Sequence, residues 1–192
     1  MGHMETVKDS VNTDIPPYYI PHHFVLRQKA VTTQLRVVFD ASCKTTSGRS
    51  LNDNLLTGQK LQQDISEVLL KYRLHKIVFT ADIKMMYRFI NICKEHRDFQ
   101  RILWRFSPLD PVQEYRLCTV TFGVASAPFL ALRTLRQLAI DEANAFPLAS
   151  QVLLNDVFVD DVVTGSDNLD DALALQRQLT SICKAGTFEL RK

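Results

Sequence analysis

The stretch NDVFVDDVVTG, residues 155–165, carries two adjacent aspartates, Asp160 and Asp161, between two runs rich in β-branched residues. If these runs pair as a tight hairpin, both carboxylates lie at its tip. Two like charges side by side repel each other, and a tight turn does not need both. A divalent cation would remove the conflict, because hard cations bind carboxylate oxygens. An ordinary Asp-rich turn fits the same residues, so this stretch alone leaves both interpretations open.

A third carboxylate, Asp82, follows the apolar run 77–81, which reads as a buried strand where a charge is unexpected. A carboxylate at a strand end and a pair on a hairpin tip can meet on neighbouring strands. Such a site can hold two metal ions about 3.5–4 Å apart, the arrangement used for in-line phosphoryl displacement. Taken alone, Asp82 also fits the N-cap of a short helical turn.

The rest of the chain mixes strand-like and helix-like patterns. The spacing of apolar residues predicts helices at 61–72, after Ser126, and from Asp167 to a C-terminal Gly186. Strand-like segments are 24–30, 35–40, 77–82, 101–105, 114–121 and 153–163, the first two forming a hairpin. Because strands and helices do not alternate strictly, we expect an α+β fold with an antiparallel sheet packed on helices.

Composition narrows the classes of protein without naming one. The chain has 192 residues, 46% of them hydrophobic, which is enough for a substantial core, and its formal net charge is only +2. This small net charge still allows a local basic groove beside an acidic site. The four cysteines are widely spaced, and we expect them to be reduced and mostly buried. No apolar run approaches the ~20 residues of a membrane span, so no membrane partner is expected.

Four segments resemble the motifs of reverse transcriptases, and along the chain they occur in the order that the family has. FVDD (158–161) resembles their Tyr-x-Asp-Asp motif, and TADIKMMY (80–87) resembles their first catalytic motif. FGVASAPF (122–129) resembles the motif that opens a palm helix, and LRVVFDAS (35–42) resembles the fingers motif with its phosphate-binding arginine. The amino-acid sequences of shorter segments are similar to those of the BEL/Pao group of LTR retrotransposons: PHH (21–23), SLND (50–53) and QRILW (100–104).

The resemblance implies a right-hand polymerase fold made of fingers and palm. Residues 24–81 would be mainly fingers, and 82–192 mainly palm with a returning fingers segment at about 88–118. Before them, 1–4 reads as a cloning scar and 5–23 as an extended N-terminal arm. The thumb and RNase H parts are not expected in this sequence. We therefore expect weak or no primer extension by this chain alone.

The resemblance also assigns a metal site. Asp82 and Asp160 would bridge Mg²⁺ or Mn²⁺ ions, Asp161 would be the third carboxylate, and the peptide oxygen of Ile83 would add a ligand. These ions would lower the pKa of the primer 3′-hydroxyl and neutralise charge on the leaving pyrophosphate.

Further residues would bind the nucleotide. Tyr87 would lie under the sugar of the incoming dNTP, Arg36 would bind its triphosphate, and Gly123 would allow close backbone approach. Lys29 would be a second phosphate contact, if the hairpin loop aligns without gaps, and Phe122 would lie beside the nucleotide. Core packing for Tyr87, solvation for Lys29 and an ordinary turn for Gly123 remain alternatives.

Gly123, Ser126 and Phe158 would lie along the template and primer. Two of the nucleic-acid-side positions depart from the family. Phe158 replaces the commoner Tyr, and Phe122 stands where retroviral enzymes usually have Gln. The basic residues Lys184, Arg191 and Lys192 lie near the motif that follows the palm helix in the family, where one could protonate pyrophosphate, although a solvated charge is the simpler interpretation.

We therefore expect an RNA- and DNA-templated DNA polymerase core, a nucleotidyltransferase of retrotransposon replication. Its partners would be an RNA or DNA primer–template, dNTPs and other parts of a Pol polyprotein. Its location would be cytoplasmic, in virus-like particles, with a nuclear stage. The main alternative is a domesticated, non-catalytic domain that binds nucleic acid or protein. An unrelated metal-dependent phosphotransferase is a further alternative, which the fingers-like and Gly123 segments disfavour.

Overall fold

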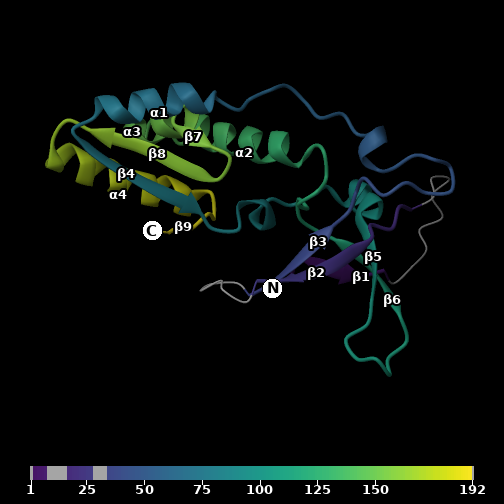
Figure 1. Cartoon of the computed structure of the whole chain (residues 1–192). Helices are drawn as coiled ribbons and strands as arrows, with labels where there is room; N and C mark the ends of the chain where they lie inside the picture. Colours follow the sequence, from purple (N-terminus) through teal and green to yellow (C-terminus); the bar gives the residue numbers. More distant parts are fainter. Residues whose placement is uncertain (1, 8–16, 28–33, 192) are drawn as a thin grey trace. The chain divides into compact units, whose positions relative to one another are not determined.

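The computed structural model describes residues 2–7, 17–27 and 34–191 (Figure 1). The chain forms two units, each built from two stretches of sequence. These are Met1–Thr57 with Ile90–Ala127, and Gly58–Phe89 with Pro128–Lys192. The assignment of the expected arm, fingers and palm to these stretches stays a prediction.

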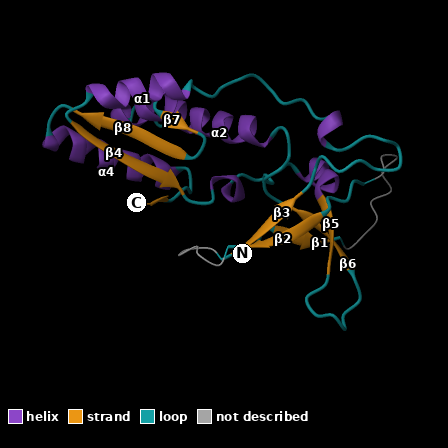
Figure 2. Cartoon of the chain, viewed as in Figure 1, coloured by secondary structure: helices purple, strands orange, loops and turns teal. Residues whose placement is uncertain are grey.

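The first unit contains two small antiparallel sheets (Figure 2). One has the order β1-β6-β5, with β1 at Met4–Thr6, β6 at Gln113–Leu117 and β5 at Arg101–Trp104. The other pairs β2 (His22–Leu26) with β3 (Leu35–Phe39). The 3₁₀-helices η1 (Asn52–Asn54) and η3 (Lys94–Gln100) complete it.

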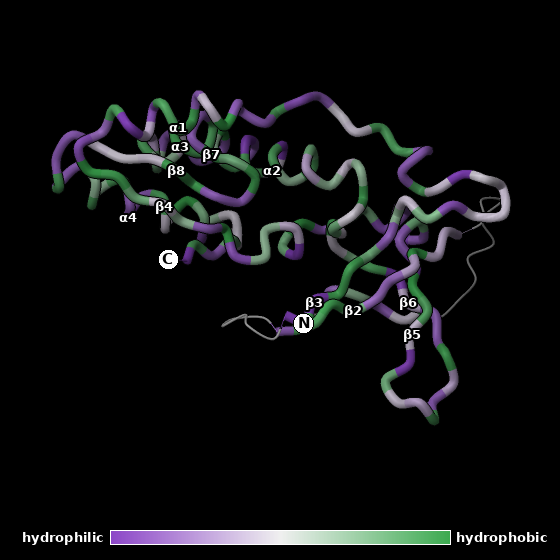
Figure 3. The backbone as a smooth tube through the Cα atoms, in the orientation of Figure 1, coloured by the Kyte–Doolittle hydropathy of each residue, from purple (hydrophilic) through white to green (hydrophobic). Residues whose placement is uncertain are grey.

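The hairpin of β2 and β3 confirms the pairing predicted from the sequence, with Phe24 opposite Val37. Its apolar side chains are exposed on both faces: Phe24, Val25, Leu26, Leu35, Val37 and Val38. The tube of β3 is accordingly coloured mainly as hydrophobic (Figure 3). The strand predicted at 114–121 is shorter than expected, because it ends at Leu117.

Ion pairs connect β1 to β6 and η3 in this unit. Glu5 Oε1 accepts hydrogen bonds from Arg116 Nε at 2.6 Å and from Arg97 Nη1 at 3.3 Å. Arg101, buried at the start of β5, donates from Nε to Asp98 Oδ1 at 2.9 Å. Buried charges need such partners, because desolvation without compensation is costly.

The second unit is built on a four-stranded antiparallel sheet with the order β7-β8-β4-β9. The strands are β7 (Val157–Phe158), β8 (Asp161–Ser166), β4 (Ile77–Ile83) and β9 (Leu190–Arg191). Its two central strands bury one face and expose the other. Val162 and Thr164 of β8 are buried opposite Ala81 and Phe79, whereas Val78 and Thr80 of β4 are exposed.

Four α-helices accompany this sheet in the described residues: α1 (Ile65–Leu74), α2 (Ala127–Asp141), α3 (Pro147–Asn155) and α4 (Leu169–Ala185). Buried residues recur along α4 at helical spacing, from Ala172 to Cys183. Side chains join neighbouring helices: Ser150 Oγ of α3 donates to the Ala139 carbonyl of α2 at 2.7 Å. Gln178 Oε1 of α4 accepts from the Leu148 N–H at the start of α3 at 3.0 Å.

The predicted helix ends are close to the observed ones. Helix α2 begins at Ala127, directly after Ser126. Helix α4 begins with Asn168 as its N-cap, one residue after the predicted Asp167, and its C-cap is Gly186 as expected. The helix predicted to begin at 61 begins at Ile65.

The prediction of a strand from residue 153 was wrong, because α3 extends to Asn155. Apolar residues at 149, 152 and 153 recur with the period of a helix, and Pro147 occupies a first-turn position that suits proline. Only Val157–Phe158 forms the first arm of the hairpin.

All four cysteines are free, and the expectation that most are buried holds for only two of them. Cys118 and Cys183 are buried, whereas Cys43 and Cys93 are exposed in loops. Burial raises the pKa of the Cys183 thiol to about 12. No helix in the described part of the chain is both long enough and apolar enough to cross a membrane.

Candidate functional site

Asp82 and Asp161 are cross-strand neighbours at one end of the second unit's sheet. Asp82, near the end of β4, lies directly opposite Asp161, the first residue of β8. Directly opposite residues of antiparallel strands direct their side chains to the same face, with Cβ atoms about 4.5–5.5 Å apart. By the strand alternation, this is the face of Val78 and Thr80, the exposed one.

Asp160 lies in the turn that joins β7 to β8. Phe158 pairs with Asp161, so Val159 and Asp160 are the two residues of the hairpin loop. The carbonyl of Asp160 accepts a hydrogen bond from the Ile83 N–H at 2.8 Å, which holds this turn against the end of β4. The hairpin expected from the sequence therefore exists, and only one of the two adjacent aspartates is in the loop itself.

The turn is strained at Val159, whose φ is +58°. A β-branched residue rarely adopts this left-handed conformation, and such outliers persist where the surroundings enforce them. The side chain of Gln62 enforces this conformation through two hydrogen bonds to the backbone of the turn. Its Oε1 accepts from the Val159 N–H at 3.0 Å, and its Nε2 donates to the Val157 carbonyl at 3.3 Å.

Asp82 also has a basic neighbour on its other side. Strand β9 places Arg191 directly opposite Asp82. Arg191 Nε donates a hydrogen bond to Asp82 Oδ2, and the two side chains form an ion pair. At the adjacent position of the same junction, Lys84 Nζ pairs with Glu189 Oε2 at 2.7 Å.

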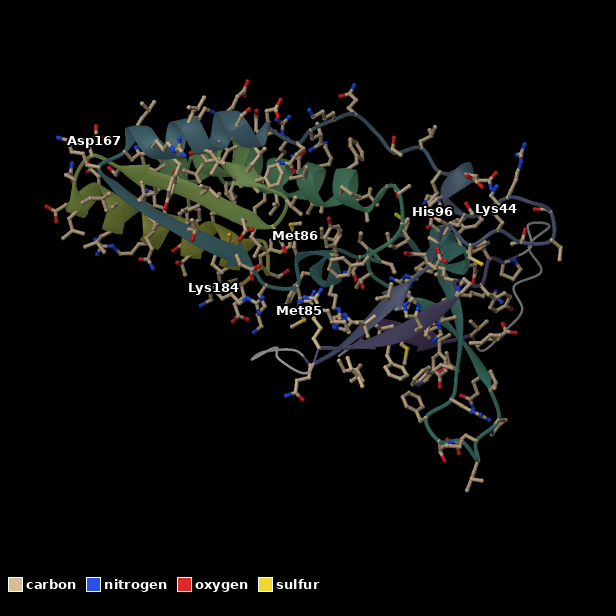
Figure 4. All side chains as sticks on the ribbon, in the orientation of Figure 1. Lys44, Met85, Met86, His96, Asp167 and Lys184 are labelled. Carbon is tan, nitrogen blue, oxygen red and sulfur yellow. The ribbon has the colours of Figure 1, made fainter. Side chains whose placement is uncertain are left out.

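Tyr87 follows β4 in the 3₁₀-helix η2 (Met86–Phe89), and its side chain is buried. Burial, and after it the negative charge of Asp160, raises the pKa of the Tyr87 hydroxyl. Met85 and Met86, labelled in Figure 4, lie between β4 and Tyr87, and Met85 also has a positive φ, of 50°. The second unit therefore brings Tyr87 to the same end of the sheet as the carboxylates.

Gly123, in the first unit, lies in a loop that no larger residue could occupy unchanged. Its φ is +91°, and a Cβ there would stand 2.3 Å from the carbonyl oxygen of Phe39. Asn52 holds the loop: its Nδ2 donates to the Gly123 carbonyl at 2.9 Å, and its Oδ1 accepts from the Ala125 N–H at 2.8 Å. The sequence stretch 50–53 contains Asn52 but gave it no role.

The remaining predicted nucleotide-side residues belong to the first unit or lie outside the described residues. Arg36 is exposed on β3, opposite Val25. Phe122 is exposed and Ser126 is half-buried, on either side of the Gly123 loop. Lys29 lies outside the described residues.

Among the described residues, no three His, Cys, Asp or Glu side chains form a group able to hold a metal ion. The donor types nevertheless fit a hard divalent cation, which takes carboxylate and peptide oxygens. Asp82 and Asp161 are neighbours, Asp160 adjoins them, and the Asp82 carboxylate is bound by a cationic guanidinium. The residues therefore fit such an ion in kind and in place on the sheet, and in the structure the Asp82 carboxylate is bound to Arg191.

The chain's structure is similar to that of a viral protease–reverse transcriptase. Its fold matches the crystal structure of a protease–reverse transcriptase from Prototype Foamy Virus with a TM-score of 0.69 and 16% sequence identity. The match covers 98% of this chain and 21% of the viral protein, so the chain spans about a fifth of that protein's length. No protein-family model and no curated protein sequence matches the chain. At this identity the likeness establishes a reverse transcriptase-like fold.

Proposed function

We propose that this chain is the polymerase core of a reverse transcriptase and that it adds deoxynucleotides to a primer 3′-hydroxyl on an RNA or DNA template. One observation carries the proposal: within a reverse transcriptase-like fold, Asp82 lies directly opposite Asp161, next to the turn residue Asp160, on the exposed face of the sheet. These are the same carboxylates that the sequence motifs single out. Fingers and palm are the names we propose for the first and second units.

The carboxylates Asp82, Asp160 and Asp161, with the peptide oxygen of Ile83, would hold Mg²⁺ or Mn²⁺. Such ions polarise phosphoryl oxygens and lower the pKa of a bound hydroxyl. In the reaction, the primer 3′-oxygen would lose its proton to water and form a bond to the α-phosphorus of the dNTP. The bond between that phosphorus and the bridging oxygen of pyrophosphate breaks. Little covalent chemistry is left to the protein, which must position the reactants.

Several residues of the chain are suited to that positioning. The buried ring of Tyr87, close enough to Asp160 to be influenced by its charge, would form the floor under the sugar and exclude a 2′-hydroxyl. The Arg36 guanidinium, exposed on β3, would bind the triphosphate, and Lys29 would contribute a second contact. The Gly123 loop, held by Asn52, would let backbone approach the nucleotide.

The exposed Phe122 would border the nucleotide, and Ser126 with Phe158 would contact the template and primer. The wording of the shorter motifs supports an origin in a BEL/Pao-type retrotransposon. A Pol polyprotein would then supply further parts, and replication in cytoplasmic particles with a nuclear stage would be the setting.

The experiment that tests the catalytic proposal is single-nucleotide addition to a primed RNA template, with Mg²⁺ or Mn²⁺, by the chain as it stands. The comparison variants are Asp160→Asn and Asp156→Asn. Asp156 is a matched control, because it directly precedes β7 and its carboxylate accepts a hydrogen bond from Thr164 Oγ1 at 3.0 Å. We expect slow addition that Asp160→Asn abolishes and Asp156→Asn retains. Equal rates for Asp160→Asn and the parent would remove the catalytic assignment.

One observation favours a second function, a non-catalytic domain that binds nucleic acid or protein. The Asp82 carboxylate is bound by Arg191, and no described group of three ligands is assembled. Titration of Mn²⁺ separates the two functions. A polymerase core binds the ion through Asp82, so that Asp82→Asn weakens binding, whereas a non-catalytic domain binds nucleic acid with no dependence on this carboxylate.

A further inference from the structure

Three charged residues lie side by side across β8, β4 and β9. Asp82 is directly opposite Asp161 on one side and directly opposite Arg191 on the other. Because directly opposite residues share a face, the row carries two negative charges followed by one positive charge. Like charges placed opposite each other destabilise a sheet, so a cation beside them offsets the repulsion.

The guanidinium of Arg191 binds the Asp82 carboxylate directly. Its Nε donates to Asp82 Oδ2, and the carboxylate side chain is only 14% exposed while the arginine is 51% exposed. A divalent cation on this carboxylate needs oxygen lone pairs that the guanidinium already uses. It would also be repelled by the positive charge of Arg191 at short range. The arginine and a cation therefore compete for the same group.

We propose that Arg191 is the counter-ion of Asp82 in the metal-free chain and gives up this carboxylate when a divalent cation binds. The inference rests on the proposed function, because that function assigns the cation to Asp82. Arg191 would then be a positioning residue, which sets how tightly the site binds its ion and holds Asp82 in place between cycles.

The exchange requires movement of one side chain rather than of a strand. Strand β9 is held to β4 independently, because Lys84 N–H donates to the Glu189 carbonyl at 2.9 Å and their side chains form an ion pair at 2.7 Å. Arg191 is half-exposed, so its guanidinium can turn into solvent while the backbone pairing remains. The Lys84–Glu189 pair is also a matched control, since it lies one residue beyond the paired ends of β4 and β9 and does not include Asp82.

The test is titration of the full chain with Mn²⁺, followed by the electron paramagnetic resonance signal of the free ion. The variants are Arg191→Gln, Arg191→Lys, Lys84→Gln and Asp82→Asn. We expect Arg191→Gln to bind Mn²⁺ about 3- to 10-fold more tightly than the parent, because the competing ion pair and a repulsive charge are both removed. Lys84→Gln should match the parent, and Arg191→Lys should lie between them.

Thermal unfolding gives a second readout that needs no activity. In EDTA, Arg191→Gln should unfold at a lower temperature than Lys84→Gln, because Asp82 loses the ion pair that Arg191 makes with it. In saturating Mn²⁺ that difference should disappear, since the ion then takes the place of the guanidinium at Asp82. A purely structural arginine would lower the unfolding temperature equally in both conditions, which would overturn the inference.

The two proposals fail in different ways. If Arg191→Gln binds Mn²⁺ no more tightly than the parent while Asp82→Asn binds it more weakly, the competition is refuted and the metal site stands. If Asp82→Asn binds Mn²⁺ as the parent does, Asp82 is not a ligand, and both the competition and the proposed metal site are refuted.

Discussion

The side-chain oxygen of Gln62 accepts a hydrogen bond from the Val159 N–H across 97 residues of sequence, at 3.0 Å. Val159 has a φ of +58°, a conformation that costs a residue with a Cβ roughly 1–2 kcal/mol. Of the two loop residues only Val159 has a positive φ, a backbone conformation that glycine adopts most readily. Gln62 therefore holds a strained turn whose second residue is Asp160.

Substitution of Gln62 should release this turn. Gln62→Ala removes hydrogen bonds to the Val159 N–H and the Val157 carbonyl, and should lower the free energy of unfolding by about 1–2 kcal/mol. If the proposed function is right, nucleotide addition should fall by more than this loss of folded protein explains, because Asp160 moves with the turn. Urea unfolding and single-nucleotide addition measure the two effects.

Gln63→Ala is the control for this change, since it truncates the same side chain one residue away. It should leave nucleotide addition near the parent rate. Equal losses in the two variants would mean that the Gln62 contact does not position the turn.

Relief of the strain at Val159 should raise the free energy of unfolding, in contrast to the loss expected for Gln62→Ala. Val159→Asn should raise the free energy of unfolding by about 0.5–1 kcal/mol, because asparagine tolerates the left-handed region better than a β-branched residue. Val163→Asn, in the extended backbone of β8, should instead lower it. Urea midpoints for both variants test the pair, and a less stable Val159→Asn would argue that its side-chain contacts outweigh the strain.

Substitution of Gly123 and of Gly48 by alanine distinguishes the cost of a steric clash from the cost of a positive φ. Gly123→Ala should lower the free energy of unfolding by about 2–4 kcal/mol, because its Cβ would meet the Phe39 carbonyl oxygen in addition to the strain of φ +91°. Gly48 also has a positive φ, +76°, but a Cβ there meets nothing within 4 Å. Gly48→Ala should therefore cost only about 1 kcal/mol. Similar losses in the two variants would contradict the clash.

Local patterns were sufficient to predict the elements in which one period dominates. The hairpin of β2 and β3, strand β4 and helix α4 follow from alternation or from helical spacing together with a capping residue. Helix α3 was missed because its apolar run adjoins a real strand, and a short apolar run fits either period. Pro147 was the signal that could have separated them.

The residues of the candidate site also fall into those that local sequence patterns predict and those that they do not. A carboxylate at the end of β4 and another in the β7–β8 hairpin could be placed on neighbouring strands from their positions in the sequence. The contacts made by Gln62, Asn52 and Arg191 could not, because each joins residues distant in sequence through one side chain. Periodicity and turn chemistry carry no information about such long-range polar contacts.

Glu5 should make the stability of the first unit depend on pH in the acidic range. Burial opposes its ionisation, but hydrogen bonds and charges of Arg116 and Arg97 outweigh it and lower the pKa of the Glu5 carboxyl below 4.5. A lowered folded-state pKa stabilises the fold above the unfolded pKa, and that stabilisation is lost as the pH falls through the folded value. The urea midpoint of the parent should therefore exceed that of Glu5→Gln at neutral pH, and the difference should shrink as the pH falls below the ordinary carboxyl range. A difference that persists unchanged at low pH would show that Glu5 acts through packing rather than through its charge.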